Sequence, residues 1–259
     1  MRRELDLAGS VGSRKGQSTL LAKVARRFKG AEIVGATMER GSELGRGLYS
    51  LADLRVYLAF SSEWKEPKKD AGRALDWLQE VLLPVGHRRR RPDYSFGDLI
   101  SLFVVRELRN RGVRGPDIRT AELYLRKKWN TDRPFTSGEI QTDGLGIYVD
   151  DDWISGQIES AEREGQQVMR ELVRERLTSV HYDRTTERAA YWVPQKHVLV
   201  DPRVQFGAPV VSGSRIPTAA VIDMTHYASP VEIERQLNIS AEKVEAALSF
   251  ERRLTALRN

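Results

Sequence analysis

The chain contains no cysteine among its 259 residues. Neither disulfides nor thiolate metal sites can therefore hold it together, so the free energy of folding has to come from side-chain packing. Because domains typically hold roughly 100–200 residues, this length favours two or three small cores over one large core. The lack of cysteine also fits a cytoplasmic protein, since the cytoplasm is reducing.

Positive charge is concentrated in one segment of the chain. The formal net charge is +6, and residues 84–133 hold thirteen Lys and Arg against six Asp and Glu, so the remainder has a net charge of −1. A local excess of this kind is typical of a nucleic-acid-binding surface, because Lys and Arg displace counterions condensed on phosphates. A solvated charged face without a ligand is the common alternative.

The apolar pattern does not favour a membrane or secreted protein. No stretch approaches the roughly 18 consecutive apolar residues of a membrane span, and acidic residues and glycines interrupt residues 4–12, where a signal peptide would be apolar. Residues 1–43 lack sustained periodicity and are predicted to form a flexible leader. The glycine-rich run 9–16 lacks the Gly-Lys-Ser/Thr ending of a phosphate loop, so no nucleotide site is expected there.

Apolar stripes of helical spacing predict four helices between residues 44 and 133. These helices begin near Leu51, Ala71, Phe96 and Asp117. Ser50 and Ser95 stand where they can cap the first and third helices, and Pro116 suits the first turn of the fourth. The segment 87–93 is too polar for a core and suits an exposed ribbon or loop.

Helix, turn, helix, basic ribbon and two further helices is the order of a winged helix-turn-helix, and residues 49–129 resemble its MerR-type version. The resemblance rests on Tyr49-Ser-Leu-Ala-Asp-Leu, Leu82-Leu-Pro, Ser95-Phe-Gly-Asp-Leu and Leu108-Arg-Asn-Arg-Gly. In that family the second helix contacts base edges in the major groove, while the basic ribbon, called the wing, contacts the phosphate backbone. The resemblance implies that operator DNA is contacted by Arg73, Trp77, Gln79, Arg88, Arg89, Arg90, Arg91 and Tyr94.

Residues 134–200 are predicted to form a small mixed module that bridges the two ends of the chain. Three short strands are expected within residues 178–200, because apolar and aromatic side chains alternate there with turn residues. Residues 156–177 have the composition of a helix, which is the candidate element for coupling the two ends of the chain. The acidic run 150–152 is interpreted as a domain boundary, with a divalent-cation site as the rarer alternative.

The last unit, residues 201–259, is predicted to be a loop followed by three helices. These helices span about 217–227, 230–237 and 241–257. Ser229 and Glu232 form a capping box for the middle helix, and Pro230 suits its first turn. The short connection 238–240 makes the last two helices a helix-turn-helix pair.

Residues 199–252 resemble the small helical domain that ends many bacterial VapB-type antitoxins. The motif that carries the resemblance is Gly207-x-Pro-Val-x-x-Gly-Ser-Arg-Ile-Pro217, preceded by Asp201-Pro202. The resemblance implies a partner toxin, a PIN-domain ribonuclease whose acidic, metal-dependent site is blocked by the antitoxin. The loop residues are assigned either to partner binding or to bracing the helices, and they are Gly207, Pro209, Gly213, Arg215 and Pro217.

The C-terminal helices differ in charge from the basic segment. Residues 229–258 contain five Glu and five Lys or Arg, so their net charge is zero. A neutral helix-turn-helix lacks the positive excess with which DNA-binding surfaces attract phosphates. This charge balance favours protein recognition, either of the toxin or of a second subunit.

No catalytic pattern is visible in the sequence. The four histidines lie far apart and none has the spacing that places two metal ligands on one helix face, and no Gly-x-Ser-x-Gly nucleophile motif occurs. We therefore expect a protein that is not an enzyme and that uses no cofactor and no metal.

Together these features predict a predominantly helical α+β protein with three folded parts, residues 44–133, 134–200 and 201–259. The expected function is that of a homodimeric antitoxin, which inhibits a PIN-domain ribonuclease toxin and binds operator DNA to regulate its own transcription. The alternative is a stand-alone MerR-like transcriptional regulator whose C-terminal unit is a sensor or dimerisation domain.

Overall fold

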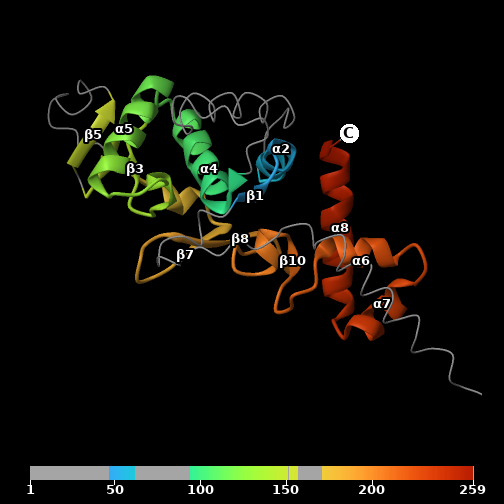
Figure 1. Cartoon of the computed structure of the whole chain (residues 1–259). Coiled ribbons are helices and arrows are strands. Elements are labelled where there is room, and N and C mark those ends of the chain that lie inside the picture. Colours follow the sequence, from blue (N-terminus) through green and yellow to red (C-terminus); the bar gives the residue numbers. More distant parts are fainter. Residues whose placement is uncertain (1–46, 62–93, 151, 157–170, 259) are drawn as a thin grey trace, which may run out of the picture. The chain divides into compact units, whose positions relative to one another are not determined.

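The computed structural model describes residues 47–61, 94–150, 152–156 and 171–258, all of which belong to the unit Arg40–Asn259 (Figure 1). The α-helices of these ranges are α2 (Leu51–Phe60), α4 (Phe96–Asn110), α5 (Gly115–Lys128), α6 (Thr218–Met224), α7 (Pro230–Leu237) and α8 (Ala241–Arg258). The strands are β1 (Gly47–Tyr49), β2 (Tyr94–Ser95), β3 (Gln141–Thr142), β4 (Gly146–Val149), β5 (Asp152–Gly156), β6 (Glu171–Leu172), β7 (Val180–Tyr182), β8 (Ala189–Gln195), β9 (Val198–Val200) and β10 (Val210–Val211). The described protein is therefore mixed, with six α-helices and small antiparallel sheets. None of these helices combines the length and apolarity that crossing a bilayer requires.

Serine caps begin α2 and α4, as the sequence predicts. The Ser50 hydroxyl accepts a hydrogen bond from the Asp53 N–H at 3.2 Å, and the Asp53 carboxylate accepts one from the Ser50 N–H at 3.1 Å. Ser95 and Asp98 make the same reciprocal pair at the start of α4. Each box satisfies two backbone donors that a helix N-terminus otherwise leaves unpaired, which fixes where these helices begin.

The winged helix-turn-helix stays a prediction. Its second helix, predicted at 71–83, and its basic ribbon at 87–93 lie outside the described residues, as does the predicted leader 1–43. Its first, third and fourth helices correspond to α2, α4 and α5.

Two four-stranded antiparallel sheets follow the helices, with strand orders β5-β4-β3-β6 and β10-β9-β8-β7. The second sheet contains the three strands predicted within residues 178–200. The prediction of a helix over residues 156–177 is wrong for residues 171–176. Residues 171–172 form β6, and residues 173–176 form a 3-10 turn. β6 pairs with β3, and the Val173 N–H donates to the Ile140 carbonyl at 2.9 Å, so sheet pairing takes the backbone donors that a helix would use.

The acidic run 150–152 does not separate two cores. Strands β4 and β5 are hydrogen-bonded neighbours, with Val149 paired to Asp152, and Asp150 adopts φ 50° in the tight connection between them. Aspartate tolerates this left-handed conformation better than most residues, so a turn explains its presence here. The predicted domain boundary is therefore a hairpin turn.

One buried core joins elements from nearly the whole described chain, and Trp192 of β8 lies inside it. Its ring makes edge contacts with Phe103 of α4 at 5.2 Å and with Tyr57 of α2 at 5.6 Å between ring centroids. Its indole Nε1–H donates to the Ser179 hydroxyl at 3.2 Å, so the one polar group of the ring is satisfied. The sheet β10-β9-β8-β7 and the N-terminal helices thus share one core.

Helices α6, α7 and α8 surround a second, smaller core. It consists of Val211, Val221, Ile233, Ile239, Val244, Ala247 and Leu248. The predicted capping box of Ser229 and Glu232 begins α7, and Asn238 ends it in the left-handed conformation at φ 53°. The last half of α8 leaves this core: Phe250 packs on Phe60 at 4.8 Å between centroids, inside the larger core.

Candidate partner-binding surface

Most of the residues predicted to contact DNA lie outside the described residues. These are Arg73, Trp77, Gln79, Arg88, Arg89, Arg90 and Arg91. Tyr94 is described: it belongs to β2, pairs with Tyr49 of β1 and is 3% exposed. Burial also raises the pKa of its hydroxyl. A side chain in this position is part of the core and has little surface to offer a phosphate, which argues against a wing role for Tyr94.

In the described part of the basic segment, most cations form ion pairs or hydrogen bonds with other residues of the protein. Residues 94–133 contain nine Lys and Arg, and six of the arginines hold partners within the protein. Four of them form ion pairs, namely Arg111 with Glu107, Arg114 with Asp117, Arg126 with Glu122, and Arg133 with Asp98. Arg109 donates to the Val113 carbonyl, and Arg106, which is 7% exposed, donates to the Ser61 hydroxyl at 2.7 Å. Burial lowers the pKa of Arg106 to about 10. The positive excess available to phosphates is therefore smaller here than the sequence count suggests.

The loop between β9 and α6, residues 201–217, is held by hydrogen bonds along its length. At its start, the Arg203 guanidinium donates to both carboxylate oxygens of Asp201, at 2.9 and 2.8 Å. The buried Tyr49 hydroxyl donates to the Gly207 carbonyl at 2.8 Å, and the Gln205 side-chain amide donates to the Arg215 carbonyl at 2.9 Å. These hydrogen bonds anchor the loop both on the N-terminal strand β1 and on itself.

The prolines and glycines of this loop have structural roles. Thr218 donates its N–H to the Pro209 carbonyl at 3.0 Å, and Pro217 pairs with Val210 in an isolated bridge at the start of α6. Gly207 and Gly213 adopt φ +78° and +75°, a region that disfavours side chains. Bracing therefore accounts for Gly207, Pro209, Gly213 and Pro217.

Arg215 does not brace the loop. Its side chain is exposed, and in the described part of the chain no hydrogen bond or ion pair joins its guanidinium to another residue. The loop uses the backbone carbonyl of Arg215, and the guanidinium remains available to a ligand, as the assignment to partner binding requires.

Two glycine substitutions separate backbone strain from the anchoring contact. Gly207→Ala is expected to lower the free energy of unfolding by about 3 kcal/mol, because its Cβ would lie 2.4 Å from the Tyr49 hydroxyl in addition to the left-handed strain. Gly213→Ala has similar strain, but its Cβ meets only the Lys243 Nζ at 3.6 Å, so a smaller loss of about 1 to 2 kcal/mol, from backbone strain alone, is expected. Urea unfolding of both variants measures the difference, and equal losses would contradict an anchoring role for Tyr49.

Phe206 is the feature of this loop that the sequence did not predict. Its side chain is 61% exposed, and its backbone is left-handed at φ 55° and ψ 34°, directly after Gln205 at φ 47°. Left-handed backbone costs a bulky residue about 1 to 2 kcal/mol, and an exposed ring recovers little of that by packing. The loop thus holds an aromatic ring in solvent at the expense of stability.

Two cations lie on the same loop region. Lys243 of α8 approaches Gly213, with its Nζ 3.6 Å from the position of a Cβ there, and Arg215 follows two residues later. None of the carboxylates in the described ranges lies within ion-pair distance of either cation. By contrast, Arg203 is neutralised by Asp201, and Lys196 and His197 both approach Glu242. Arg215 and Lys243 therefore give the loop a local positive charge.

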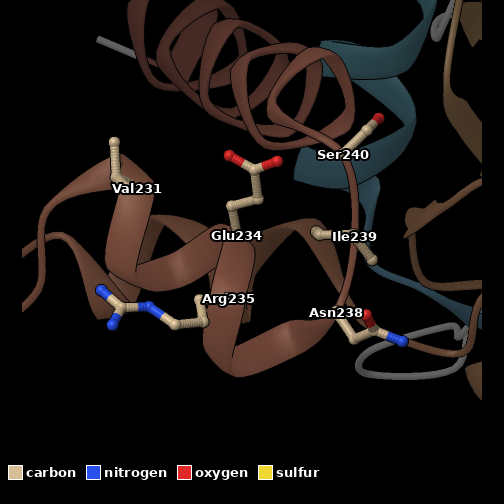
Figure 2. A pocket seen from close by; sticks show the side chains of 6 residues that line it. All are labelled: Val231, Glu234, Arg235, Asn238, Ile239 and Ser240. Atoms are coloured by element: carbon tan, nitrogen blue, oxygen red, sulfur yellow. The ribbon is translucent and has the colours of Figure 1, made fainter.

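An open groove of about 550 Å³ lies between α7 and the start of α8 (Figure 2). It is lined by Val231, Glu234, Arg235, Asn238, Ile239 and Ser240. The Glu234 side chain points toward α8, whereas the Arg235 side chain points away from it (Figure 2). A carboxylate and an amide beside apolar side chains can hold a small polar molecule or a side chain of another protein.

The exposed beginning of α8 is acidic. The side chains of Glu242 and Glu245 are 72% and 67% exposed. Hydrogen bonding from His197 and the nearby positive charge of Lys196 lower the pKa of Glu242, so this carboxylate is ionised at neutral pH. In a helix-turn-helix that reads DNA, the N-terminal residues of the second helix enter the major groove, where two carboxylates would be repelled by phosphates.

In the described residues, no group of three or more His, Asp or Glu is placed to hold a metal ion.

Comparison with known proteins finds similarity to a protein family and to solved structures. Residues 198–250 match the family described as "Protein of unknown function (DUF433)", a range that includes the loop, α6, α7 and the first part of α8. The crystal structure of Rv2018 from Mycobacterium tuberculosis is similar at a TM-score of 0.49 and 18% sequence identity, covering 78% of this chain and 97% of that chain. No curated protein matches the chain.

Proposed function

We propose that the C-terminal unit, residues 198–258, binds a protein partner, and that the chain is the antitoxin of a toxin–antitoxin pair. The observation that carries this proposal is the exposure of large apolar side chains on that unit: Phe206 is 61%, Tyr227 56% and Val231 67% exposed. Exposed apolar and aromatic side chains are typical of protein interfaces, whereas DNA-binding surfaces are rich in cations.

The identity of the partner comes from the resemblance to VapB-type antitoxins. That resemblance favours a PIN-domain ribonuclease, whose catalytic site is acidic. Arg215 and Lys243, which have no carboxylate partner among the described residues, fit an acidic surface, because complementary charge speeds association and selects the partner.

The DNA-binding half of the proposal rests on the basic run 88–91 and on the order of helices around it. Operator binding by a homodimer is the expected arrangement, because helix-turn-helix dimers read half-sites about 34–36 Å apart. A regulator of this kind would control the operon that encodes both the antitoxin and the toxin.

Co-expression with the protein encoded by the neighbouring reading frame tests the proposal. We expect a stable complex, with loss of the neighbour's ribonuclease activity. A neighbour that is neither bound nor inhibited would contradict the antitoxin function.

The second candidate is a stand-alone MerR-like regulator, which the groove between α7 and α8 favours. Its volume of about 550 Å³ falls within the range of small-molecule sites, roughly 300–1,000 Å³. In that case operator binding would respond to a small polar effector and would not respond to the neighbouring protein.

A further inference from the structure

We propose that Phe206 is the central anchor of the partner interface, and that it enters an apolar pocket with an acidic rim on the partner protein. This inference rests on the proposed function, because it assigns the contact through which the antitoxin holds its toxin. It goes beyond that function by naming the residue and the chemistry of the opposing surface.

Phe206 is held in a strained backbone conformation. A bulky aromatic residue at φ 55° is strained, and asparagine or glycine would occupy the same backbone more easily. The ring does not recover the strain through burial, since it is 61% exposed. Strain that the described residues offset so little by burying the ring points to a contact with another molecule.

Hydrogen bonds hold both residues that flank Phe206. The residue before it bonds to the Arg215 carbonyl, and the residue after it accepts a hydrogen bond from the buried Tyr49 hydroxyl. Both neighbours are therefore fixed, so the ring is presented without ordering a flexible segment on binding. Preorganisation of this kind increases affinity, and central aromatic anchors in pockets carry a large share of interface energy.

The charges near Phe206 specify the partner. Gln205 connects the Phe206 turn directly to Arg215, and Lys243 lies beside Gly213 of the same loop. Neither cation forms an ion pair with a carboxylate in the described part of the chain. Both can therefore form ion pairs with carboxylates that surround the pocket of the bound protein. The same two cations could meet phosphates, but the exposed aromatic ring of Phe206 favours a protein over duplex DNA.

The test compares Phe206→Asn with a matched control, Tyr124→Asn. Tyr124 is 50% exposed on α5, so both variants replace an exposed aromatic ring by the same amide. The full-length variants are titrated by calorimetry with the protein encoded by the neighbouring reading frame, and their urea midpoints are measured. For Phe206→Asn we expect an unchanged or higher urea midpoint, because asparagine relieves the strain, together with at least a thirtyfold weaker affinity. For Tyr124→Asn the affinity should stay within about threefold of wild type.

Each alternative outcome of this titration has a distinct meaning. An affinity of Phe206→Asn within threefold of wild type, while wild type binds, overturns the anchor but leaves the proposed function intact. A lower urea midpoint also overturns the proposal, because it would give Phe206 a structural role. If wild type does not bind the neighbouring protein, the proposed function fails, and the anchor with it.

Two further readouts identify other occupants. Sedimentation equilibrium of Phe206→Asn alone would reveal loss of self-association, which would assign the ring to a second copy of this chain. A gel shift would reveal loss of operator binding, which would assign the loop to DNA. Either result overturns the proposal, whereas unchanged self-association and unchanged operator binding are the results it predicts.

Discussion

Trp192→Ala is expected to lower the free energy of unfolding by about 3 to 5 kcal/mol, enough to unfold much of the protein at 37 °C. The indole is fully buried and packs on aromatic rings from α2 and α4, so its removal leaves a large cavity where the sheet meets the helices. The change also leaves the Ser179 hydroxyl without its donor. Urea unfolding followed by circular dichroism measures the loss.

Tyr191→Ala is the matched control for this prediction. Tyr191 is the preceding residue of β8 and is only half-buried, where its ring stacks on His181 with centroids 4.6 Å apart. A loss of about 1 kcal/mol or less is expected from this more exposed contact. Similar losses for the two variants would contradict a core centred on Trp192.

Replacing Arg88, Arg89, Arg90 and Arg91 together by alanine is expected to abolish tight operator binding. If each arginine neutralises one phosphate, the slope of log affinity against log salt should decrease by about 3 to 4, since each contact contributes about 0.9. The cations of residues 94–133 should compensate little, because six of the nine already hold partners within the protein. Gel shifts at a series of salt concentrations measure the slope.

Lys196→Ala combined with Arg252→Ala is the control for that experiment. Both side chains are well exposed, at 80% and 63%, but they belong to the C-terminal part of the chain. Their removal should leave the salt dependence of operator binding unchanged. An equal change of slope in both variants would indicate non-specific charge effects.

Local sequence signals predicted the beginnings of the helices well. Ser50, Ser95 and Ser229 each cap a helix through a reciprocal pair with the third residue of that helix. Such contacts span three residues, so they can be recognised without knowledge of the fold. The strands within residues 178–200 were also predicted, because their apolar alternation is local.

Features that depend on distant contacts were not predicted. Residues 171–176 have a helical composition, yet β6 pairs with β3 across about thirty residues of chain, which no local pattern reveals. The larger core likewise contains both Tyr57 and Phe250, which come together although they lie far apart in the sequence. Some of the ion pairs that occupy the cations of residues 94–133 also join residues far apart in the sequence, such as Asp98 and Arg133.

The candidate site was predicted in part. The motif that resembles VapB-type antitoxins identified the loop 201–217, and it left Arg215 between partner binding and bracing. The exposed guanidinium makes no bracing contact with the described residues. Phe206 was missed entirely, since neither its exposure nor its left-handed backbone follows from the residue type. Burial and backbone conformation at that position come only from the three-dimensional structure.

The central claim is that duplex DNA and the partner protein bind to different parts of this chain. Its most direct test is to measure, for the variant with alanine at positions 88–91, both operator affinity by gel shift and the affinity for the neighbouring protein by calorimetry. The account predicts that operator binding is lost while the protein complex keeps its wild-type affinity. Loss of both activities in a variant with an unchanged urea midpoint would contradict it.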